Sequence, residues 1–147
     1  TTFEGKELVI VGRSNIVGKP AYFLALERNA TTTTVHSFTW RAGTLPAHTR
    51  RADILIVAMG KAEFIKAEMV QPGAIVVDVG INMVPALDAA GSPVLDEKGR
   101  PKRRTVGDVA FDEVKEVAGA ITPVPGGVGS VTNVLLMKNV VRAAERR

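Results

Sequence analysis

The residues of this chain that are best suited to bind a ligand form a loop at positions 12–20, which reads Gly-Arg-Ser-Asn-Ile-Val-Gly-Lys-Pro and follows the apolar run 8–11. A strand that ends at glycine and leads into a helix forms a cradle for phosphate, because bare backbone and unpaired helix N–H groups face the anion. Arg13 adds a permanent charge and Ser14 a hydroxyl donor. The loop therefore predicts a nucleotide site. The alternative is an ordinary strand-to-helix turn, because Arg13 and Ser14 occupy the place of a second glycine.

The type of nucleotide is indicated by residues 36–39, at the end of the second expected strand. A common dinucleotide site has a carboxylate there to bind the ribose 2′-hydroxyl. This chain has His-Ser-Phe-Thr instead, with no acid. A neutral Ser37 opposite Arg13 leaves room and charge for a 2′-phosphate, so we expect NADP rather than NAD. We interpret His36 as a residue at the strand edge, on the adenosine side, and not as a catalytic base.

A second candidate loop covers residues 121–129, which read Ile-Thr-Pro-Val-Pro-Gly-Gly-Val-Gly. Its prolines fix φ and its glycines leave backbone bare, so a flat ligand could approach the main chain closely. None of its side chains can transfer a proton. Together with residues 80–82 (Gly-Ile-Asn), this loop is expected at the same edge of the sheet. A purely structural turn is the alternative.

Apolar strand-like runs alternate with helix-like stretches along the chain. This alternation predicts an α/β fold, a Rossmann-like parallel sheet with helices on both faces and with ligands at the carboxyl ends of the strands. The interrupted segment 82–105 predicts a surface excursion or a hairpin. The expected strands are 6–11, 31–36, 53–58, 73–79 and 118–122, and the expected helices are 17–29, 45–50, 65–70, 111–117 and 131–146.

Composition limits the possible classes. With 147 residues, of which 46% are hydrophobic, the chain is expected to form one domain, residues 1–147. The net charge of +4 suits anionic ligands, but scattered Lys and Arg and only 5% aromatic residues argue against a nucleic-acid surface. No apolar run approaches the ~20 residues that span a membrane. The absence of cysteine excludes disulfides and thiolate metal sites. We expect no bound metal and a cytoplasmic protein, with a mitochondrial location as the alternative.

Five blocks of sequence, taken in order, carry a resemblance to a known family. They are residues 11–20, 52–60, 77–82, 106–109 and 121–129. With these blocks the chain resembles the C-terminal, NADP-binding domain of the bifunctional methylenetetrahydrofolate dehydrogenase/methenyltetrahydrofolate cyclohydrolase family. The resemblance covers essentially the whole chain.

The resemblance implies roles for particular residues. In the family the first loop holds the dinucleotide, an arginine and a serine meet the 2′-phosphate, and an isoleucine lines the nicotinamide pocket. These implied cofactor-binding residues are Gly12, Arg13, Ser14, Ser37 and Ile81. The implied substrate-binding residues, which border the folate cleft, are Pro125, Gly126, Gly127, Val128 and Gly129. The family usually continues this loop with Pro-Met, whereas this chain has Ser130 and Val131.

The resemblance also implies a parent reaction on tetrahydrofolate derivatives in a homodimer. A hydride passes from 5,10-methylenetetrahydrofolate to NADP⁺, and water then converts the methenyl product to 10-formyltetrahydrofolate. The family's catalytic lysine, the tyrosine four residues before it and a glutamine belong to an N-terminal domain that has no counterpart here. Tyr22, the only tyrosine, fits no such motif. We therefore expect no catalytic residue in this chain and an absent N-terminal catalytic domain.

Two other functions remain open from the residues. The chain could be a dinucleotide-binding module without turnover, which binding without a measurable rate would indicate. A sugar or hydroxy-acid dehydrogenase domain is less favoured, because it would need a general acid near the cleft and the loop at 121–129 offers none.

The expected helix 131–146 carries apolar side chains on more than one stripe, which indicates that another domain covers it.

Overall fold

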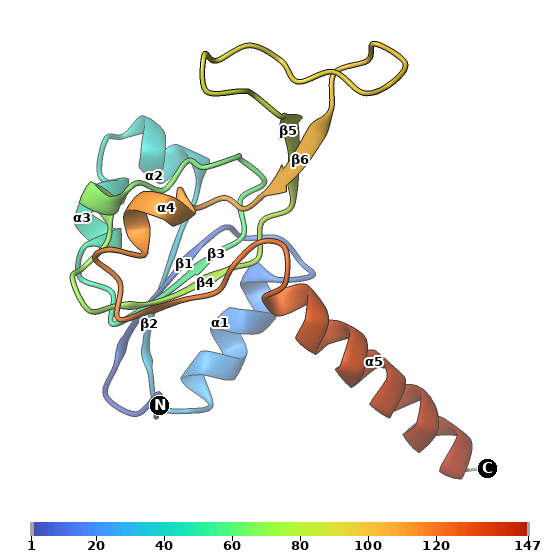
Figure 1. Cartoon of the computed structure of the whole chain (residues 1–147). Coiled ribbons are helices and arrows are strands. Elements are labelled where there is room, and N and C mark those ends of the chain that lie inside the picture. Colours follow the sequence, from blue (N-terminus) through green and yellow to red (C-terminus); the bar gives the residue numbers. More distant parts are fainter. Residues whose placement is uncertain (1, 147) are drawn as a thin grey trace.

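A parallel sheet of five strands organises the chain in the computed structural model, which describes residues 2–146 (Figure 1). The sheet order is β2-β1-β3-β4-β7. The chain starts in β1, adds β2 on one side and then continues with β3 on the other. The carboxyl ends of β1 and β3 therefore flank the switch point at which such sheets bind ligands. The strands are β1 (Glu7–Val11), β2 (Thr31–Val35), β3 (Ile54–Val57), β4 (Ile75–Asp78) and β7 (Ala120–Ile121).

The central strand β1 is apolar on both faces, as a covered parallel strand must be. Leu8 and Ile10 pack into a cluster with Ala25 of the first helix. Val9 and Val11 point to the opposite face and pack into the larger cluster. The predicted α/β class, with a parallel sheet and helices on both faces, is confirmed.

The helices lie on both sides of the sheet (Figure 1). Of the predicted helices, 65–70 was wrong, because Ile65 forms a bridge with Val109 and only a short 3₁₀ turn follows. A short helix after β2 was not predicted. It begins because the His36 ring nitrogen accepts a hydrogen bond from the Phe38 N–H, and the Thr39 hydroxyl accepts one from the His36 N–H. The helices are α1 (Gly18–Leu26), α2 (Ser37–Arg41), α3 (Leu45–Thr49), η1 (Ala67–Met69), α4 (Phe111–Val114) and α5 (Val128–Glu145).

The segment between residues 82 and 105 is a hairpin, one of the two predicted possibilities. Strands β5 (Asn82–Pro85) and β6 (Arg103–Val106) pair antiparallel and extend away from the parallel sheet (Figure 1). Near the tip, the carboxylates of Asp88 and Asp96 each accept backbone N–H groups of their own turns. The hairpin therefore begins next to the carboxyl edge of the sheet and ends in solvent.

Helix α5 extends away from the rest of the chain (Figure 1). None of its described side chains is buried, and apolar ones such as Val134 and Met137 are 68% and 67% exposed. The sheet face beside α1 is also incompletely covered, since Ile56, Ile75 and Val77 stay partly exposed. In the part of the chain that the structure describes, no helix is both long and apolar enough to cross a bilayer.

Candidate functional site

Two cavities lie at the carboxyl edge of the sheet. The first, here named cavity A, has a volume of about 330 Å³ and is formed where β1, β2 and β3 end. Four of the five cofactor residues expected from the sequence line it: Gly12, Arg13, Ser14 and Ser37. Residues from two separate sequence motifs thus meet in one place.

Gly12 is the residue at which β1 ends and the first loop begins. Its φ is +130°, which an L side chain rarely adopts, and its N–H donates to the Val35 carbonyl oxygen at 2.9 Å. A Cβ added at Gly12 would overlap the carbonyl oxygen of Ala58, just after β3. Glycine is therefore required because the ends of β1 and β3 touch, a reason that adds to the close ligand approach expected from the sequence.

Ser14 has a structural task as well as a place in cavity A. Its hydroxyl oxygen accepts hydrogen bonds from the N–H groups of Val17 at 3.1 Å and Gly18 at 3.3 Å. It thereby satisfies two donors at the start of α1. The hydroxyl proton is still available to donate to a ligand in cavity A.

Arg13 is exposed at the rim of cavity A, beside an aromatic ring. Its guanidinium carbon lies 5.8 Å from the centre of the Phe38 ring, and that of Arg41 lies 5.2 Å from the same ring. Such cation–π contacts hold a guanidinium near a preferred position at small cost. The Phe38 ring therefore gathers two positive charges at the first turn of α2, beside Ser37.

Cavity A also contains residues that sequence reasoning did not select. His36 lines it, while its ring nitrogen caps α2. Lys61 lines it too, with its ammonium nitrogen 4.8 Å from the centre of the Phe64 ring. The sequence around Lys61 has no recognisable local pattern. Its place in cavity A follows only from the sheet order, which puts the end of β3 beside the end of β1.

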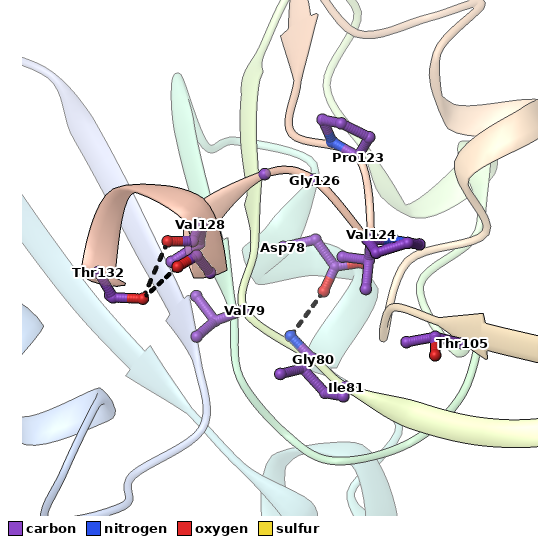
Figure 2. A pocket seen from close by; sticks show the side chains of 13 residues that line it. Asp78, Val79, Gly80, Ile81, Thr105, Pro123, Val124, Gly126, Val128 and Thr132 are labelled. Carbon is purple, nitrogen blue, oxygen red and sulfur yellow. Dashed lines mark hydrogen bonds between the residues drawn. The ribbon is translucent and has the colours of Figure 1, made fainter. Parts of the chain in front are cut away.

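Cavity B, the second cavity, has a volume of about 380 Å³ and lies where β4 and β7 end (Figure 2). Ile81 lines it from the β4 side. From the β7 side it is lined by all five of the remaining predicted residues, which are Pro125, Gly126, Gly127, Val128 and Gly129. The prediction that the Pro/Gly loop and the Gly-Ile-Asn loop share one edge of the sheet is thus confirmed.

Local backbone geometry explains two glycines of the Pro/Gly loop. Gly126 has a φ of +100°, and the preceding Val124–Pro125 peptide bond is cis. A Cβ added at Gly127 would overlap the Pro123 carbonyl oxygen, because the loop doubles back on itself. The loop then enters α5, where the Thr132 hydroxyl lies 2.8 Å from the Gly129 carbonyl oxygen (Figure 2).

Two buried acids, Asp78 and Asp108, lie at the same edge of the sheet as the cavities, and Asp78 lines cavity B. Asp78, at the end of β4, is 3% exposed; its carboxylate accepts hydrogen bonds from the N–H groups of Gly80, Asp108 and Val109 at 2.9–3.0 Å. Burial raises the pKa of Asp78 above its ordinary value of 3.8, and the nearby Asp108 adds to the rise, while the three N–H bonds oppose it. Figure 2 shows the bond to Gly80 at the wall of cavity B.

Asp108 is fully buried and accepts four hydrogen bonds. One carboxylate oxygen accepts from the N–H groups of Met59 at 2.6 Å and Gly60 at 2.8 Å. The other accepts from the Lys61 N–H at 2.9 Å and from the side-chain amide of Asn82 at 2.8 Å. No local pattern predicts this role of Asp108, because its donors are 26 to 49 residues away along the chain.

The chemistry available in cavity B is binding and orientation. Among its lining residues only Asp78 is ionisable, and all of its carboxylate bonds are made to backbone N–H groups. The other walls are backbone, apolar side chains and the hydroxyls of Thr105 and Thr132. Within residues 2–146 there is also no group of three or more His, Cys, Asp or Glu side chains arranged to hold a metal ion.

The whole amino-acid sequence shows to which family the chain belongs. The sequence model described as "Tetrahydrofolate dehydrogenase/cyclohydrolase, NAD(P)-binding domain" matches residues 1–147. The chain belongs to this family. The tetrahydrofolate dehydrogenase/cyclohydrolase resemblance found in the sequence is confirmed, and the chain is an NAD(P)-binding domain of that family.

Individual relatives agree with this assignment. The chain is 52% identical over 143 residues to "Bifunctional protein FolD" of Parvibaculum lavamentivorans, and 52% identical over 142 residues to the protein of the same name in Caulobacter sp.. These matches cover 97% of this chain but 44% and 45% of the two relatives. The chain therefore spans less than half the length of the curated relatives that it matches.

Solved structures show the same fold and the same partial coverage. The bifunctional FolD enzyme of Campylobacter jejuni is 42% identical with a TM-score of 0.80, and 99% of this chain covers 45% of it. The Trypanosoma brucei FolD, a methylenetetrahydrofolate dehydrogenase-cyclohydrolase solved with NADP cofactor and an inhibitor, is 38% identical with a TM-score of 0.81. The match covers 99% of this chain and 46% of the Trypanosoma brucei protein.

Proposed function

We propose that this NAD(P)-binding domain binds NADP⁺ in preference to NAD⁺, across both cavities. The adenosine half, with its 2′-phosphate, binds in cavity A against Arg13 and Ser37, and the nicotinamide binds in cavity B against Ile81. The observation that supports this most is the meeting of Gly12, Arg13, Ser14 and Ser37 in cavity A without any carboxylate among its lining residues. A carboxylate there would repel a 2′-phosphate, whereas an arginine attracts one.

We further propose that the domain serves a whole enzyme that acts on tetrahydrofolate derivatives. In the overall reaction, 5,10-methylenetetrahydrofolate loses a hydride and becomes the methenyl cation, and addition of water to that cation yields 10-formyltetrahydrofolate and a proton. NADP⁺, when bound, accepts the hydride and leaves as NADPH. The residues of this domain orient the nicotinamide at Ile81, and the loop from Pro125 to Gly129 forms one wall of the folate cleft.

The rest of the enzyme is proposed to supply the catalytic groups. Cavity B offers no free acid or base, and the chain spans less than half of its relatives, which supports an additional catalytic domain. The exposed apolar side chains of α5 and the partly covered sheet face beside α1 are suited to contact it. A homodimeric whole enzyme in the cytoplasm completes this proposal.

Calorimetric titration of the chain tests the cofactor proposal. NADP⁺ is expected to bind at least tenfold more tightly than NAD⁺, the difference that one charge-assisted bond to phosphate supplies. Equal affinities would contradict it. The ionic strength is held constant in both titrations, because exposed charges are screened by salt.

A second function, a binding module without turnover, is favoured by the lack of a free acid or base in cavity B. It describes the chain by itself and is compatible with a catalytic whole enzyme. The chain is mixed with 5,10-methylenetetrahydrofolate and NADP⁺, and formation of NADPH is followed. Binding without NADPH formation supports the module, and a measurable rate shows that this chain contains its own catalytic group.

A further inference from the structure

Asp108 is placed between the two cavities, although it lines neither of them. We propose that Asp108 is a positioning residue that fixes cavity A and cavity B relative to each other. This inference rests on the proposed function, because it assumes that the two halves of one dinucleotide occupy the two cavities. Its basis is the set of four hydrogen bonds that one fully buried carboxylate accepts from both sides.

On the side of cavity A, Asp108 holds the loop that follows β3. Three successive N–H groups, those of Met59, Gly60 and Lys61, donate to its carboxylate over 2.6–2.9 Å. Met59 and Lys61 line cavity A. Bonds to an ionised acceptor are stronger than neutral ones, so this carboxylate fixes the path of a loop that is otherwise irregular.

On the side of cavity B, Asp108 holds the segment that follows β4. The amide of Asn82 donates to Asp108 at 2.8 Å and to the Gly107 carbonyl oxygen at 3.2 Å. Asn82 directly follows Ile81, which lines cavity B. A Cβ added at Gly80 would overlap the Asp108 carboxylate, so this segment packs directly against the acid.

The chemistry of the site requires a carboxylate and not an amide. Each oxygen of Asp108 accepts two N–H donors. In Asp108→Asn, which has nearly the same shape, one of the two positions becomes an NH₂ group that faces two donors. Two bonds are lost and two partly buried donors are left without their acceptor, which is costly. The loop on one side is then released from the segment on the other side.

The experiment compares the binding of the whole dinucleotide with the binding of its adenosine half. Affinities for NADP⁺ and for adenosine 2′,5′-bisphosphate, which carries only the adenosine half, are measured for the chain and its variants. Asn82→Ala removes the bond to cavity B but leaves the three bonds to the loop beside cavity A. It is expected to weaken NADP⁺ about fivefold to tenfold, and to leave the bisphosphate within about twofold of the unmodified chain.

Asp108→Asn is expected to lower the affinity for both ligands by more than about tenfold, because it also disturbs the loop beside cavity A. Ile54→Val is the matched control, since Ile54 is buried at the start of β3 in the cluster beneath α1. It lowers the melting temperature without touching either cavity. If Asp108→Asn does not fold, the two ligand affinities of Asn82→Ala decide alone.

The outcomes separate the inference from the proposed function. Loss of NADP⁺ affinity with retained bisphosphate affinity in Asn82→Ala supports the positioning role. Unchanged NADP⁺ affinity in Asn82→Ala overturns it. An equal loss of affinity for NADP⁺ and for the bisphosphate in Asn82→Ala also overturns it. So does a loss of NADP⁺ affinity in Ile54→Val as large as that in Asn82→Ala. If the unmodified chain binds neither ligand, it is the proposed function that fails, and the inference falls with it.

Discussion

Asp108 donates its backbone N–H to the carboxylate of Asp78 at 3.0 Å, so that two buried acids at the ends of different segments are joined directly. Two neighbouring carboxylates would ordinarily repel each other. Here each is surrounded by N–H donors, three at Asp78 and four at Asp108. The pair therefore connects the segments that follow β3 and β4 through these N–H donors.

The pH dependence of stability tests the environment of Asp78. Burial raises its folded-state pKa above the ordinary 3.8, so ionisation costs more in the folded than in the unfolded chain. Its contribution to stability is fully present below pH 3.8 and is lost as the pH rises through the raised pKa. In urea unfolding, the stability of the unmodified chain relative to Asp78→Asn should fall over that window. A relative stability that grows with pH would show that the N–H bonds outweigh burial.

Arg13→Ala should remove most of the preference for NADP⁺. Loss of one charge-assisted contact to the 2′-phosphate costs on the order of 1.5–3 kcal/mol, which is tenfold or more in affinity. Binding of NAD⁺ should change little. Arg28→Ala is the matched control, because Arg28 is an exposed arginine that bonds the Leu24 carbonyl oxygen at the end of α1. Equal affinities for the two cofactors in the unmodified chain would refute the prediction, as would an identical effect of both substitutions.

Gly127→Val should damage the folate side of the site more than NADP⁺ affinity. A side chain at Gly127 would meet the Pro123 carbonyl oxygen, so the loop beside cavity B must move. Ala90→Val is the control, since Ala90 is exposed on the hairpin between β5 and β6 and lines neither cavity. In the whole enzyme, KM for the folate should rise only in the first variant. A normal folate KM with lost cofactor binding would assign this loop to the other ligand.

Helix α5 should cause the isolated chain to self-associate. Its apolar side chains are exposed, and an uncovered apolar surface of this kind favours association. Val134→Lys together with Met137→Lys should reduce association, whereas Asn133→Lys adds a charge to α5 without removing an apolar group. Light scattering over a concentration series checks this. A strictly monomeric chain at high concentration would contradict it.

Much of the fold was predictable because β1, β3 and β4 are mainly apolar runs, and the threonines of β2 are β-branched residues that favour strands. The two loops at the carboxyl edge of the sheet were predictable for a related reason, since glycine and proline mark positions where the backbone must turn or stay bare. Helix α2 was missed because its start depends on a histidine side chain, which is not a common cap. The role of Asp108 could not be read locally, because its bond to Met59 joins residues 49 apart.

The most direct test of the central claim is to follow the backbone amide signals of the chain by NMR while NADP⁺ is added. We expect shifts in both sets of residues, those of cavity A around Arg13 and Ser37 and those of cavity B around Gly80 and Ile81. Adenosine 2′,5′-bisphosphate should shift only the first set. If NADP⁺ leaves both sets unmoved, or shifts residues elsewhere on the chain, the account of one dinucleotide bound across the two cavities is wrong.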